Sequence, residues 1–581
     1  MTHRELFHRA SRLALALILC LSFSLGTMAL AQGTDGTYTA SAQGNNGPVT
    51  VSVVVSQGEI AQVDVTSHSE TAVISDPAIE RIPAAIVAGQ TLAVDTVSGA
   101  TNTSNAILSA AELCLTQAGF DIAALKSPLP SEAPTGQTIT MEADLAVVGA
   151  GGAGMIGAIQ TAQLGGTAII IEKTAAVGGN TAASGGNYAA VDPERQQPQG
   201  IEDSVEMHIE QVYTEGDSLA KKELVATMCE NALDGLHWLE DLGVEWNDTV
   251  FQVIGSLWPR THSNIESSGA YLVQVLKDNV DALDIPILFE TTATQLILED
   301  GRVVGVRASG ADGNTYEVYG KKGVLLATGG FGANLEMCRE LSEKITDNTQ
   351  TLCVASAQGD GLAMAEAAGA HLIDLEKIQM LPTSLTTLPA TNNSVLYLNQ
   401  EGQRFVREDG RRDKMSMSVL DQTGGYCYIL NDQAVVDQDG SQEKADAMIA
   451  SGDVMKFDTL EEMAQALDMP LENLQKTVED YNKLVAGEIE DEFGRTLAEL
   501  PLGKAPYYVS CKQYPMVLYT CGGVEIDTHA RALDENGQPV PGLFAAGEVT
   551  GGVHGNNRLG SHALADLTVF ARIAATTAMG E

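Results

Sequence analysis

The chain has 581 residues, of which 33 are Lys or Arg and 76 are Asp or Glu, so its formal net charge at pH 7 is −43. This negative charge repels a phosphate backbone, which excludes nucleic acid as an expected partner. The length and the 44% share of hydrophobic residues exclude a disordered or collagen-like chain and favour several folded domains.

The first 31 residues have the pattern of a secretory signal peptide. Basic residues within the first twelve positions precede an apolar run over residues 13–30, and Ala29-Leu30-Ala31 provides small residues before a polar segment. An uncleaved membrane anchor is the alternative, because a run of this length lies near the minimum that spans a bilayer. We expect an exported protein, located in the periplasm, outside the cell or at the cell surface.

Seven cysteines follow this segment, and they are odd in number and widely spaced. The chain contains no Cys-x-x-Cys pair, so neither a disulfide framework nor a zinc or iron–sulfur site is indicated. The absence of Cys-x-x-Cys-His likewise argues against an attached c-type haem. We expect no metal site, and we expect most of these cysteines to be small core residues.

A small domain of short strands and helices is predicted over residues 32–125, followed by a linker rich in Pro and Ser over residues 126–140. Near its end, Asp95-Thr96-Val97-Ser98-Gly99-Ala100-Thr101 follows a strand-like segment and opens a helical stretch. A phosphate near a helix start is stabilised by free N–H groups, and the small residues before Thr101 leave room for it. A plain helix-capping turn is the alternative interpretation.

From residue 143 the chain changes to alternating strands and helices, which predicts a parallel sheet with a nucleotide at a topological switch point. A strand over residues 144–148 leads into Gly149-Ala150-Gly151-Gly152-Ala153-Gly154, which fits G-x-G-x-x-G, and a second strand ends at Glu172. The glycines permit a tight turn and a close approach of pyrophosphate to a helix N-terminus. Glu172 can accept a hydrogen bond from a ribose hydroxyl, so the segment predicts a dinucleotide site.

Further glycine-rich segments follow this turn. Gly178-Gly179-Asn180-Thr181 and Ser184-Gly185-Gly186 add backbone donors in a nearby loop. Segments rich in glycine return over residues 325–332, 359–361 and 542–550. Their distance from the first turn predicts one nucleotide domain that an insertion interrupts.

Together these motifs resemble the FAD-binding family of fumarate reductases and of the flavoprotein subunit of succinate dehydrogenase, and especially its soluble, exported fumarate and urocanate reductases. The most specific match is Gly547-Glu548-Val549-Thr550-Gly551-Gly552-Val553-His554-Gly555-Asn556-Asn557-Arg558-Leu559-Gly560. The resemblance implies an α/β fold with a Rossmann-like FAD domain over residues 141–371 and 518–581. It also implies an inserted α+β clamp (capping) domain over residues 372–517, and a small α+β FMN-binding domain before them.

The resemblance implies two flavin cofactors. FAD would be non-covalent, because the histidine that tethers FAD in succinate dehydrogenases has no equivalent after Asn180-Thr181. Ser98-Gly99-Ala100-Thr101 matches the motif in which a threonine is joined to FMN by a phosphoester, so Thr101 would carry covalent FMN. A flavin transferase would then be required, and electrons would pass from a membrane-bound donor through FMN to FAD.

The residues expected to contact the flavins follow from these motifs. For FMN they are Asp95, Ser98, Gly99 and Thr101. For FAD they are Gly149, Gly151, Gly152, Ala153, Gly154, Glu172, Lys173, Gly179, Asn180, Thr181, Gly185, Gly186, Thr328, Gly329, Asp360, Glu548, Ala563 and Leu564.

The resemblance also implies the chemistry, which is reduction of a C=C bond conjugated to a carboxylate. Residues 402–413 resemble the family segment whose arginine, next to an aspartate, protonates the substrate, and that arginine falls on Arg412. Arg558 would grip the substrate carboxylate and stabilise the charge that develops there, while a flavin supplies hydride. For either arginine alone, a surface ion pair is the alternative interpretation.

The sequence departs from fumarate reductases at the substrate site. Leu381 and Leu518-Tyr519-Thr520 stand where those enzymes have histidines, and residues 384–394 lack the ionisable residues of their proton relay. Without two histidine ligands, a second substrate carboxylate would be costly to bury. Leu385 and Leu388 add to an apolar pocket, so we expect a substrate with one carboxylate and an apolar or aromatic tail, such as an acrylate or a cinnamate, rather than fumarate.

Tyr519 is the third candidate catalytic residue, because it can donate a proton or bind a carbonyl, as tyrosines do in the related ketosteroid dehydrogenases. A structural role for Tyr519 is the alternative, and His554 and His562 are interpreted as packing residues beside the flavin. The leading interpretation of the chain is an exported enoate reductase that serves as a terminal reductase of anaerobic respiration. A ketosteroid dehydrogenase or reductase, and an electron-transfer flavoprotein with a vestigial pocket, are the alternatives.

Overall fold

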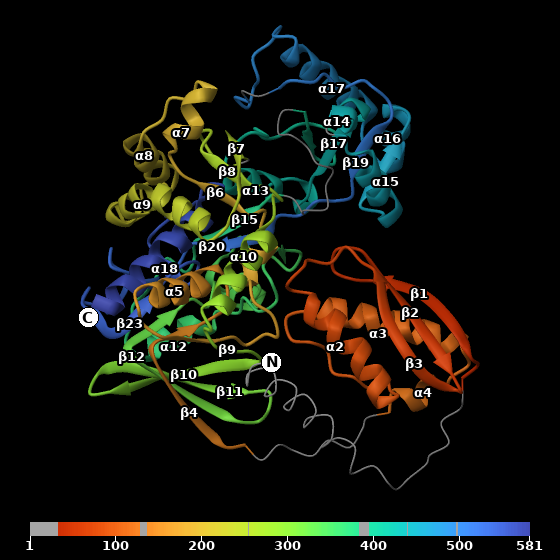
Figure 1. Ribbon diagram of the computed structural model, residues 1–581. Coiled ribbons are helices and arrows are strands. Elements are labelled where there is room, and N and C mark those ends of the chain that lie inside the picture. The colour runs from red at the N-terminus through yellow and green to blue at the C-terminus, as the bar shows by residue number, and fades with distance from the viewer. Residues whose placement is uncertain are drawn as a thin grey trace. The chain divides into compact units, whose positions relative to one another are not determined.

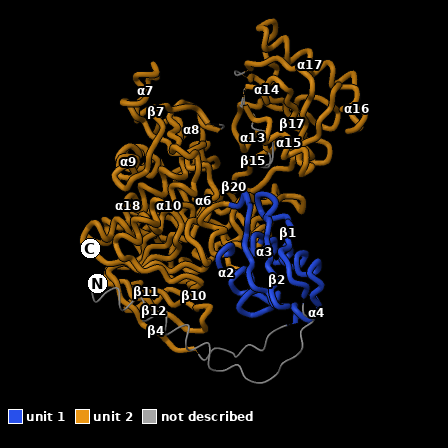
Figure 2. Tube along the Cα trace, turned by 45° about the vertical axis from the view of Figure 1, so that its right-hand side comes forward, with its two compact units in different colours: residues 1–70, 78–96, 102–131 blue, residues 71–77, 97–101, 132–581 orange. Residues whose placement is uncertain are grey.

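The computed structural model describes residues 33–127, 136–253, 255–382, 394–438, 440–495 and 498–580. These residues fall into two compact units, which Figure 2 shows in different colours. Within the described residues, the first unit comprises residues 33–70, 78–96 and 102–127, and the remaining stretches belong to the second. The predicted signal peptide and residues 128–135 of the predicted linker lie outside the described residues.

The first unit contains a three-stranded antiparallel sheet with accompanying helices (Figure 1). Its elements are β1 (Gly36–Gln43), β2 (Pro48–Ser56), β3 (Glu59–Ser67), α2 (Asp76–Gly89), α3 (Thr101–Gln117) and α4 (Ile122–Leu125). Val49, Val51 and Val53 of β2 are buried while the residues between them are more exposed, as in a strand with one face on a core. The Cys114 thiol of α3 donates to the Val51 carbonyl at 3.6 Å, so α3 packs against β2.

The centre of the second unit is a mixed sheet of strand order β10-β11-β12-β4-β5-β9, with β23 beside β12 and β22 beside β23. Its strands are β4 (Thr138–Val148), β5 (Ala168–Ile171), β9 (Ile287–Leu288), β10 (Thr291–Glu299), β11 (Arg302–Gly310), β12 (Thr315–Leu326), β22 (Arg531–Leu533) and β23 (Pro539–Ala545). Strands β12, β4, β5 and β9 run parallel, as does β23 to β12. All residues of β5 are buried, because a central parallel strand is covered on both faces.

Helices pack on this sheet (Figure 1). They include α5 (Gly152–Gln163), α12 (Asp360–Ala367) and α18 (His562–Gly580). The same unit contains α6 (Gly179–Ala183), α10 (Gly269–Ala282) and α11 (Leu335–Leu341), and α10 packs against α5 and α6. Helix α5 contributes Ile156 and Ile159 to the main hydrophobic core, and α18 contributes Phe570. The succession β4, α5, β5 is the predicted strand, glycine turn, helix and strand, and it confirms the predicted α/β class of this domain.

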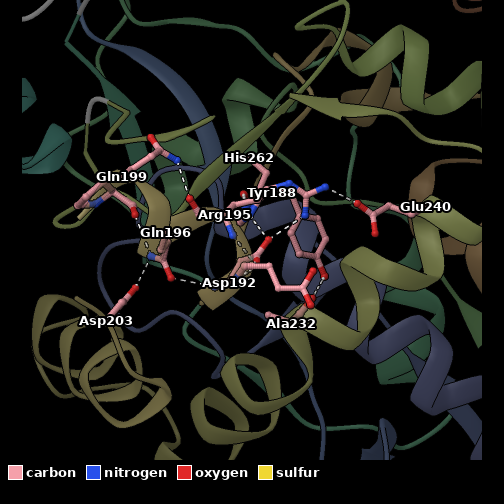
Figure 3. A network of polar contacts seen from close by, with 11 residues as sticks. Tyr188, Asp192, Arg195, Gln196, Gln199, Asp203, Ala232, Glu240 and His262 are labelled. Carbon is pink, nitrogen blue, oxygen red and sulfur yellow. Dashed lines mark hydrogen bonds and ion pairs between the residues drawn. The ribbon is translucent and has the colours of Figure 1, made fainter. Parts of the chain in front are cut away.

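A smaller sheet in the second unit is formed by β6 (Asn187–Ala189), β8 (Thr261–Asn264) and β7 (Trp246–Phe251), with α7 (Pro193–Gln196), η1 (Gln197–Gln199), α8 (Val205–Glu215) and α9 (Lys222–Asp241). Figure 3 shows its polar network, in which the Asp192 carboxylate is 3.2 Å from His262 and 2.8 Å from Arg195, and Arg195 donates to Glu240 at 2.6 Å. Although burial raises the pKa of Asp192, the His262 and Arg195 hydrogen bonds hold it below its ordinary value. The charged Asp192 thus ties α7 to β8.

The inserted region has its own sheet, of order β16-β17-β19-β18, and its own hydrophobic clusters. Its elements are β16 (Leu396–Leu398), α13 (Arg412–Leu420), η2 (Thr423–Gly425), β17 (Tyr428–Asp432), α14 (Gln433–Gln438), α15 (Gln442–Ser451), β18 (Val454–Phe457), α16 (Leu460–Leu467), α17 (Leu471–Val485) and β19 (Tyr507–Ser510). The buried Glu408 carboxylate accepts from Arg404 (2.8 and 2.6 Å) and lies 3.2 Å from Arg495. This ionic network fixes the segment that leads into α13.

Two short sheets lie where the chain enters and leaves the inserted region. One contains β13 (Gln350–Thr351), β20 (Met516–Thr520) and β15 (Ile378–Leu381), and the other contains β14 (Leu372–Ile373), β21 (Gly523–Glu525) and β24 (Thr550–Gly551). The antiparallel pairing of β15 with β20 places Gln379 opposite Tyr519. In the described part of the chain, no helix has both the length and the apolar character needed to cross a bilayer.

Candidate active site

The turn between β4 and α5 is built from glycines that leave no room for a side chain. Gly149 has φ +103°, and a Cβ there would lie 2.4 Å from the Ala327 carbonyl oxygen. A Cβ at Gly154 would lie 1.8 Å from the Gly149 carbonyl oxygen. Helix α5 starts at Gly152 without a side-chain cap, which leaves the helix start accessible to an anion such as pyrophosphate.

Glu172 follows β5 directly and lies beside this turn. Its carboxylate accepts hydrogen bonds from the Ala150 N–H (2.8 Å) and from the N–H and the hydroxyl of Thr174 (both 2.8 Å). These bonds hold the acid against the glycine turn, as predicted for an acceptor of a ribose hydroxyl. Lys173, the next residue, pairs with Asp360 at the start of α12.

A cavity of about 470 Å³ opens where β4, β5 and β12 end. Most of the residues predicted to bind FAD line it, namely Gly149, Gly151, Gly152, Ala153, Glu172, Lys173, Gly179, Asn180, Thr181, Gly185, Thr328, Gly329, Asp360, Glu548, Ala563 and Leu564. Gly154 and Gly186 do not line the cavity. Gly154 lets α5 approach the turn, and a Cβ at Gly186 would lie 2.4 Å from the Ser268 carbonyl oxygen, so both shape the backbone beneath the cavity.

Glu548 joins three segments at one wall of the cavity. Its carboxylate accepts from the Asn180 amide (2.9 Å), the Thr520 N–H (3.0 Å) and the Thr520 hydroxyl (3.2 Å). The Asn180 side-chain oxygen in turn accepts from the Val354 N–H at 2.8 Å. Burial raises the pKa of Glu548, although these hydrogen bonds favour its charged form.

These features fit a dinucleotide flavin. The glycine-lined end admits the backbone approach that pyrophosphate requires, and the Thr328 hydroxyl is a buried polar atom without a hydrogen-bond partner among the described residues. Other lining residues were missed by sequence reasoning, because they belong to no motif and their segments meet only in the fold. They include Thr291, Thr292, Ala293, Ser356, Ala357, Met364 and Leu567.

All three predicted catalytic residues, Arg412, Arg558 and Tyr519, line the same cavity. Arg412 is the first residue of α13, and its side chain packs against Gly255, where a Cβ would lie 2.7 Å from the arginine Nε. Arg558 precedes α18, and its guanidinium carbon lies 4.9 Å from the centre of the Tyr519 ring. Burial, and then the like charge of Arg558, lower the pKa of Arg412 to about 9. Two cations at one cavity favour an anionic ligand there.

Arg558 is held by backbone and side-chain contacts but keeps donor capacity. Its Nη1 donates to the Leu559 carbonyl at 3.2 Å, and its buried Nε has no hydrogen-bond partner among the described residues. The Gln379 amide donates to the Asn557 side-chain oxygen (2.7 Å) and to the Arg558 carbonyl (2.9 Å). Gln379 was not predicted, and its only signal is that it is a polar residue within the apolar segment Ile378–Leu381. The arginine can therefore donate to a carboxylate oxygen.

The third predicted catalytic residue, Tyr519, uses its hydroxyl within the protein. The hydroxyl donates to Asp566 Oδ2 at 3.3 Å, and the same oxygen lies 3.3 Å from His554 Nε2. Burial, and then the negative charge of Asp566, raise the pKa of Tyr519 well above its ordinary value. Since its ring lies against the Arg558 guanidinium, this geometry favours a supporting role for Tyr519 over proton donation.

The two histidines interpreted as packing residues are both buried. His554 contacts the Tyr519 ring edge to face, with 5.7 Å between ring centres. His562 Nδ1 lies 2.8 Å from the Gly560 carbonyl, and its Nε2 lies 2.7 Å from His208 Nε2. Because a carbonyl only accepts, His562 is protonated at Nδ1 and His208 donates to its Nε2. Burial lowers the pKa of His562 to about 3 and holds the pKa of His208 well below its ordinary value, so this pair is neutral near pH 7.

The arginines share their part of the cavity with apolar side chains. Leu381, Leu518 and Val253 line the cavity together with Arg412 and Arg558. No histidine is among the described residues that line it. The predicted contributions of Leu385 and Leu388 lie outside the described residues.

The segment predicted to carry FMN forms an exposed turn before α3. Asp95, Ser98 and Gly99 are exposed, and Gly99 has φ +86°, a conformation that glycine adopts without strain. Thr101 is the first residue of the 17-residue helix α3 and is also exposed. Its hydroxyl is therefore accessible for attachment of a phosphate, whose negative charge the helix start favours.

Comparisons with known proteins cover both parts of the chain. The model of the FAD binding domain family matches residues 144–564, and that of the FMN-binding domain family matches residues 44–116. A urocanate reductase of Eggerthella lenta is 34% identical, with 88% of this chain and 86% of that protein covered. An NADH:acrylate oxidoreductase of Vibrio harveyi is 32% identical over 88% of this chain, which spans only 58% of that protein. The open conformation of a flavocytochrome c3 fumarate reductase gives a TM-score of 0.65 at 34% identity, with 76% of this chain and 78% of that one covered.

Proposed function

This chain belongs to the FAD-binding family that includes fumarate and urocanate reductases, and we propose that it reduces the C=C bond of an α,β-unsaturated carboxylate. The observation that carries the proposal is the pair of arginines, Arg412 and Arg558, at one cavity with the glycine turn of a dinucleotide site. Relatives named for the reduction of urocanate and of acrylate support this reaction class.

The roles of the residues follow from their contacts. When bound, FAD supplies the hydride for the β-carbon. Arg558 binds the substrate carboxylate through its available Nε and stabilises the charge that develops on it. Arg412 gives a proton to the α-carbon, and a pKa near 9 makes it a stronger acid than an ordinary arginine. Tyr519 supports the Arg558 guanidinium with its ring.

The substrate that suits this cavity has one carboxylate and an apolar or aromatic tail. Leu381 and Leu518 line the cavity together with the arginines, and their side chains offer no hydrogen-bond donor to a second carboxylate. Burial of a carboxylate without such donors costs a free energy on the order of several kcal/mol. An acrylate or a cinnamate therefore fits better than fumarate. A neutral steroid enone would leave two arginines without a counter-charge, which disfavours the ketosteroid alternative.

Electron supply is the second part of the proposal. FMN is joined to Thr101 by a phosphoester, which requires a flavin transferase, and it receives electrons from a membrane-bound donor. The match of the FMN-binding domain family and the exposed position of Thr101 at a helix start support this assignment. The apolar run near the N-terminus supports export. We propose that the exported protein serves as a terminal reductase of anaerobic respiration.

The attachment site is tested by Thr101→Val, with Thr116→Val at another exposed position of α3 as the matched control. The proteins are produced with a flavin transferase, denatured and separated on a gel, and flavin fluorescence is recorded. We expect fluorescence in the wild type and in Thr116→Val but none in Thr101→Val. Equal fluorescence in all three proteins would place the FMN bond elsewhere.

The reaction is tested by the oxidation of reduced methyl viologen with acrylate, cinnamate, urocanate, fumarate or a steroid enone as acceptor. We expect the fastest turnover with a monocarboxylate that carries an apolar tail. Fumarate as the best acceptor would contradict the substrate class, and a steroid enone as the best acceptor would contradict the reaction. Rapid redox cycling of the bound flavins without turnover of any acceptor would support the electron-transfer alternative.

A further inference from the structure

Asp217 lies in the loop after α8 and forms an ion pair with Arg411, the residue that precedes Arg412. Arg411 is the N-cap residue of α13, and its Nη1 donates to Asp217 Oδ1 at 2.7 Å while its Nη2 lies 3.3 Å from Asp217 Oδ2. Asp413 orients the same guanidinium from within α13, because it accepts from Arg411 Nε (3.0 Å) and Nη2 (2.8 Å). The inserted region is thus tied to the main domain directly beside Arg412.

The same loop also contacts the segment that carries Arg558. The Asn556 amide donates to Asp217 Oδ2 at 3.0 Å, and the Asn556 N–H donates to the Gly216 carbonyl at 3.1 Å. A Cβ at Gly555 would lie 2.3 Å from the Gly216 carbonyl oxygen, so the two backbones are in close contact. One carboxylate therefore binds a neighbour of Arg412 and a neighbour of Arg558.

The conformation of this loop is costly and is held by these contacts. Asp217 has φ +58° and Ser218 has φ +56°, a left-handed conformation that costs a residue with a side chain about 1–3 kcal/mol. The Arg411 hydrogen bond is the largest cause that lowers the pKa of Asp217, so the group is a carboxylate near pH 7. The strained loop presents this charge to Arg411.

We propose that Asp217 is a positioning residue that fixes the proton donor Arg412 relative to the carboxylate-binding Arg558. This inference rests on the proposed function of the two arginines. A second tie lies one turn further along α13, where the Ser416 hydroxyl donates to the Met380 carbonyl at 3.1 Å. Loss of the Arg411–Asp217 pair therefore loosens the first turn of α13, which carries Arg412, and leaves the rest of the helix anchored.

The substitution Asp217→Asn removes the charge and preserves the size of the side chain. We expect kcat for the best enoate to fall about tenfold, because a misplaced reacting group costs up to about a hundredfold in rate. KM should change by less than about threefold, since the carboxylate-binding Arg558 keeps its own contacts. The solvent deuterium isotope effect on kcat should rise, because proton delivery becomes slower while hydride delivery is unchanged.

A double-mutant cycle shows whether the pair acts as a unit. The loss of kcat in the double variant Asp217→Asn, Arg411→Gln should be clearly smaller than the sum of the two single losses, because both single variants remove the Arg411–Asp217 interaction. The matched control is the ion pair of Arg307 and Glu317, which are 2.8 Å apart on β11 and β12 and outside the cavity lining. Glu317→Gln should leave kcat and the isotope effect unchanged.

Hydrogen–deuterium exchange of α13 provides a readout that does not depend on turnover. We expect faster exchange in the first turn of α13 in Asp217→Asn than in the wild type, with exchange in β17 unchanged. Unaltered kcat, isotope effect and exchange in Asp217→Asn would overturn the positioning role. An equal loss of kcat without a rise in the isotope effect would also overturn it, because the defect would then lie outside proton delivery. A wild-type protein that reduces no enoate would instead refute the proposed function, and the exchange comparison would still decide whether Asp217 holds α13.

Discussion

Arg412→Met is the substitution that best separates chemistry from folding at this site. Methionine keeps much of the apolar stem of arginine but has no charge and no proton to donate. Burial of the guanidinium and the like charge of Arg558 lower the pKa of Arg412 to about 9, a shift that corresponds to roughly 5 kcal/mol against the charged form. Because Arg412 lines a cavity that admits water, this figure is an upper bound on what its removal can release.

We therefore expect Arg412→Met to be about 1–3 kcal/mol more stable than the wild type, because it removes a charge that the site disfavours. Calorimetry of the FAD-loaded protein should show a midpoint that is higher by about 1–3 °C. In the viologen assay, kcat should fall by at least about a hundredfold, because a general acid contributes about 10² to 10⁴ in rate.

Arg495→Met is the matched control, because this buried arginine belongs to an ionic network outside the cavity lining. Arg495 lies 3.2 Å from Glu408 and donates to the Val395 carbonyl at 2.8 Å. Its loss leaves a buried carboxylate with less compensation, so the midpoint should fall by several degrees, on the order of 3 kcal/mol. A midpoint for Arg412→Met as low as that of Arg495→Met, or a kcat above about a tenth of the wild type, would refute the role assigned to Arg412.

Three further predictions concern the same cavity. Since burial and the like charge of Arg558 lower the pKa of Arg412 to about 9, kcat/KM should fall about tenfold per pH unit above about pH 9, and a level profile there would contradict proton donation by this group. Tyr519→Phe should keep kcat and KM within about threefold of the wild type, whereas Tyr519→Leu should raise KM about tenfold, because only the leucine removes the ring beside Arg558. Equal KM values in the two variants would contradict the supporting role of the ring. Gly154→Ala should yield protein without FAD absorbance, because its Cβ would lie 1.8 Å from the Gly149 oxygen, while Gly47→Ala, with no neighbour closer than 3.7 Å, should load FAD normally.

The nucleotide end of the cavity was predictable because its signals are local. The strand, the glycines 149–154, the helix and Glu172 follow one another within a short stretch of chain, and each residue type has a geometric reason for its place. Glu548 and Arg558 were identified by a motif of fourteen consecutive residues rather than by spacing or composition. These residues line one cavity in the fold.

The supporting contacts could not be predicted, because they join residues far apart in the chain. Arg411 and Asp217 are separated by 194 residues, and Gln379 and Asn557 by 178. The periodicity of hydrophobic residues indicates which face of a strand or a helix is buried, but it does not indicate which polar side chains meet across domains. The hydroxyl of Tyr519 is the clearest example, because only the fold shows that it bonds to Asp566.

The most direct test of the central claim is a single-turnover experiment. The bound flavins are reduced anaerobically by light, and their reoxidation by cinnamate or by fumarate is followed in a stopped-flow spectrophotometer. We predict rapid reoxidation by cinnamate, slower reoxidation by fumarate, and loss of the cinnamate reaction in Arg412→Met. Faster reoxidation by fumarate would contradict the substrate class, and the absence of reoxidation by either acid would contradict enoate reduction itself.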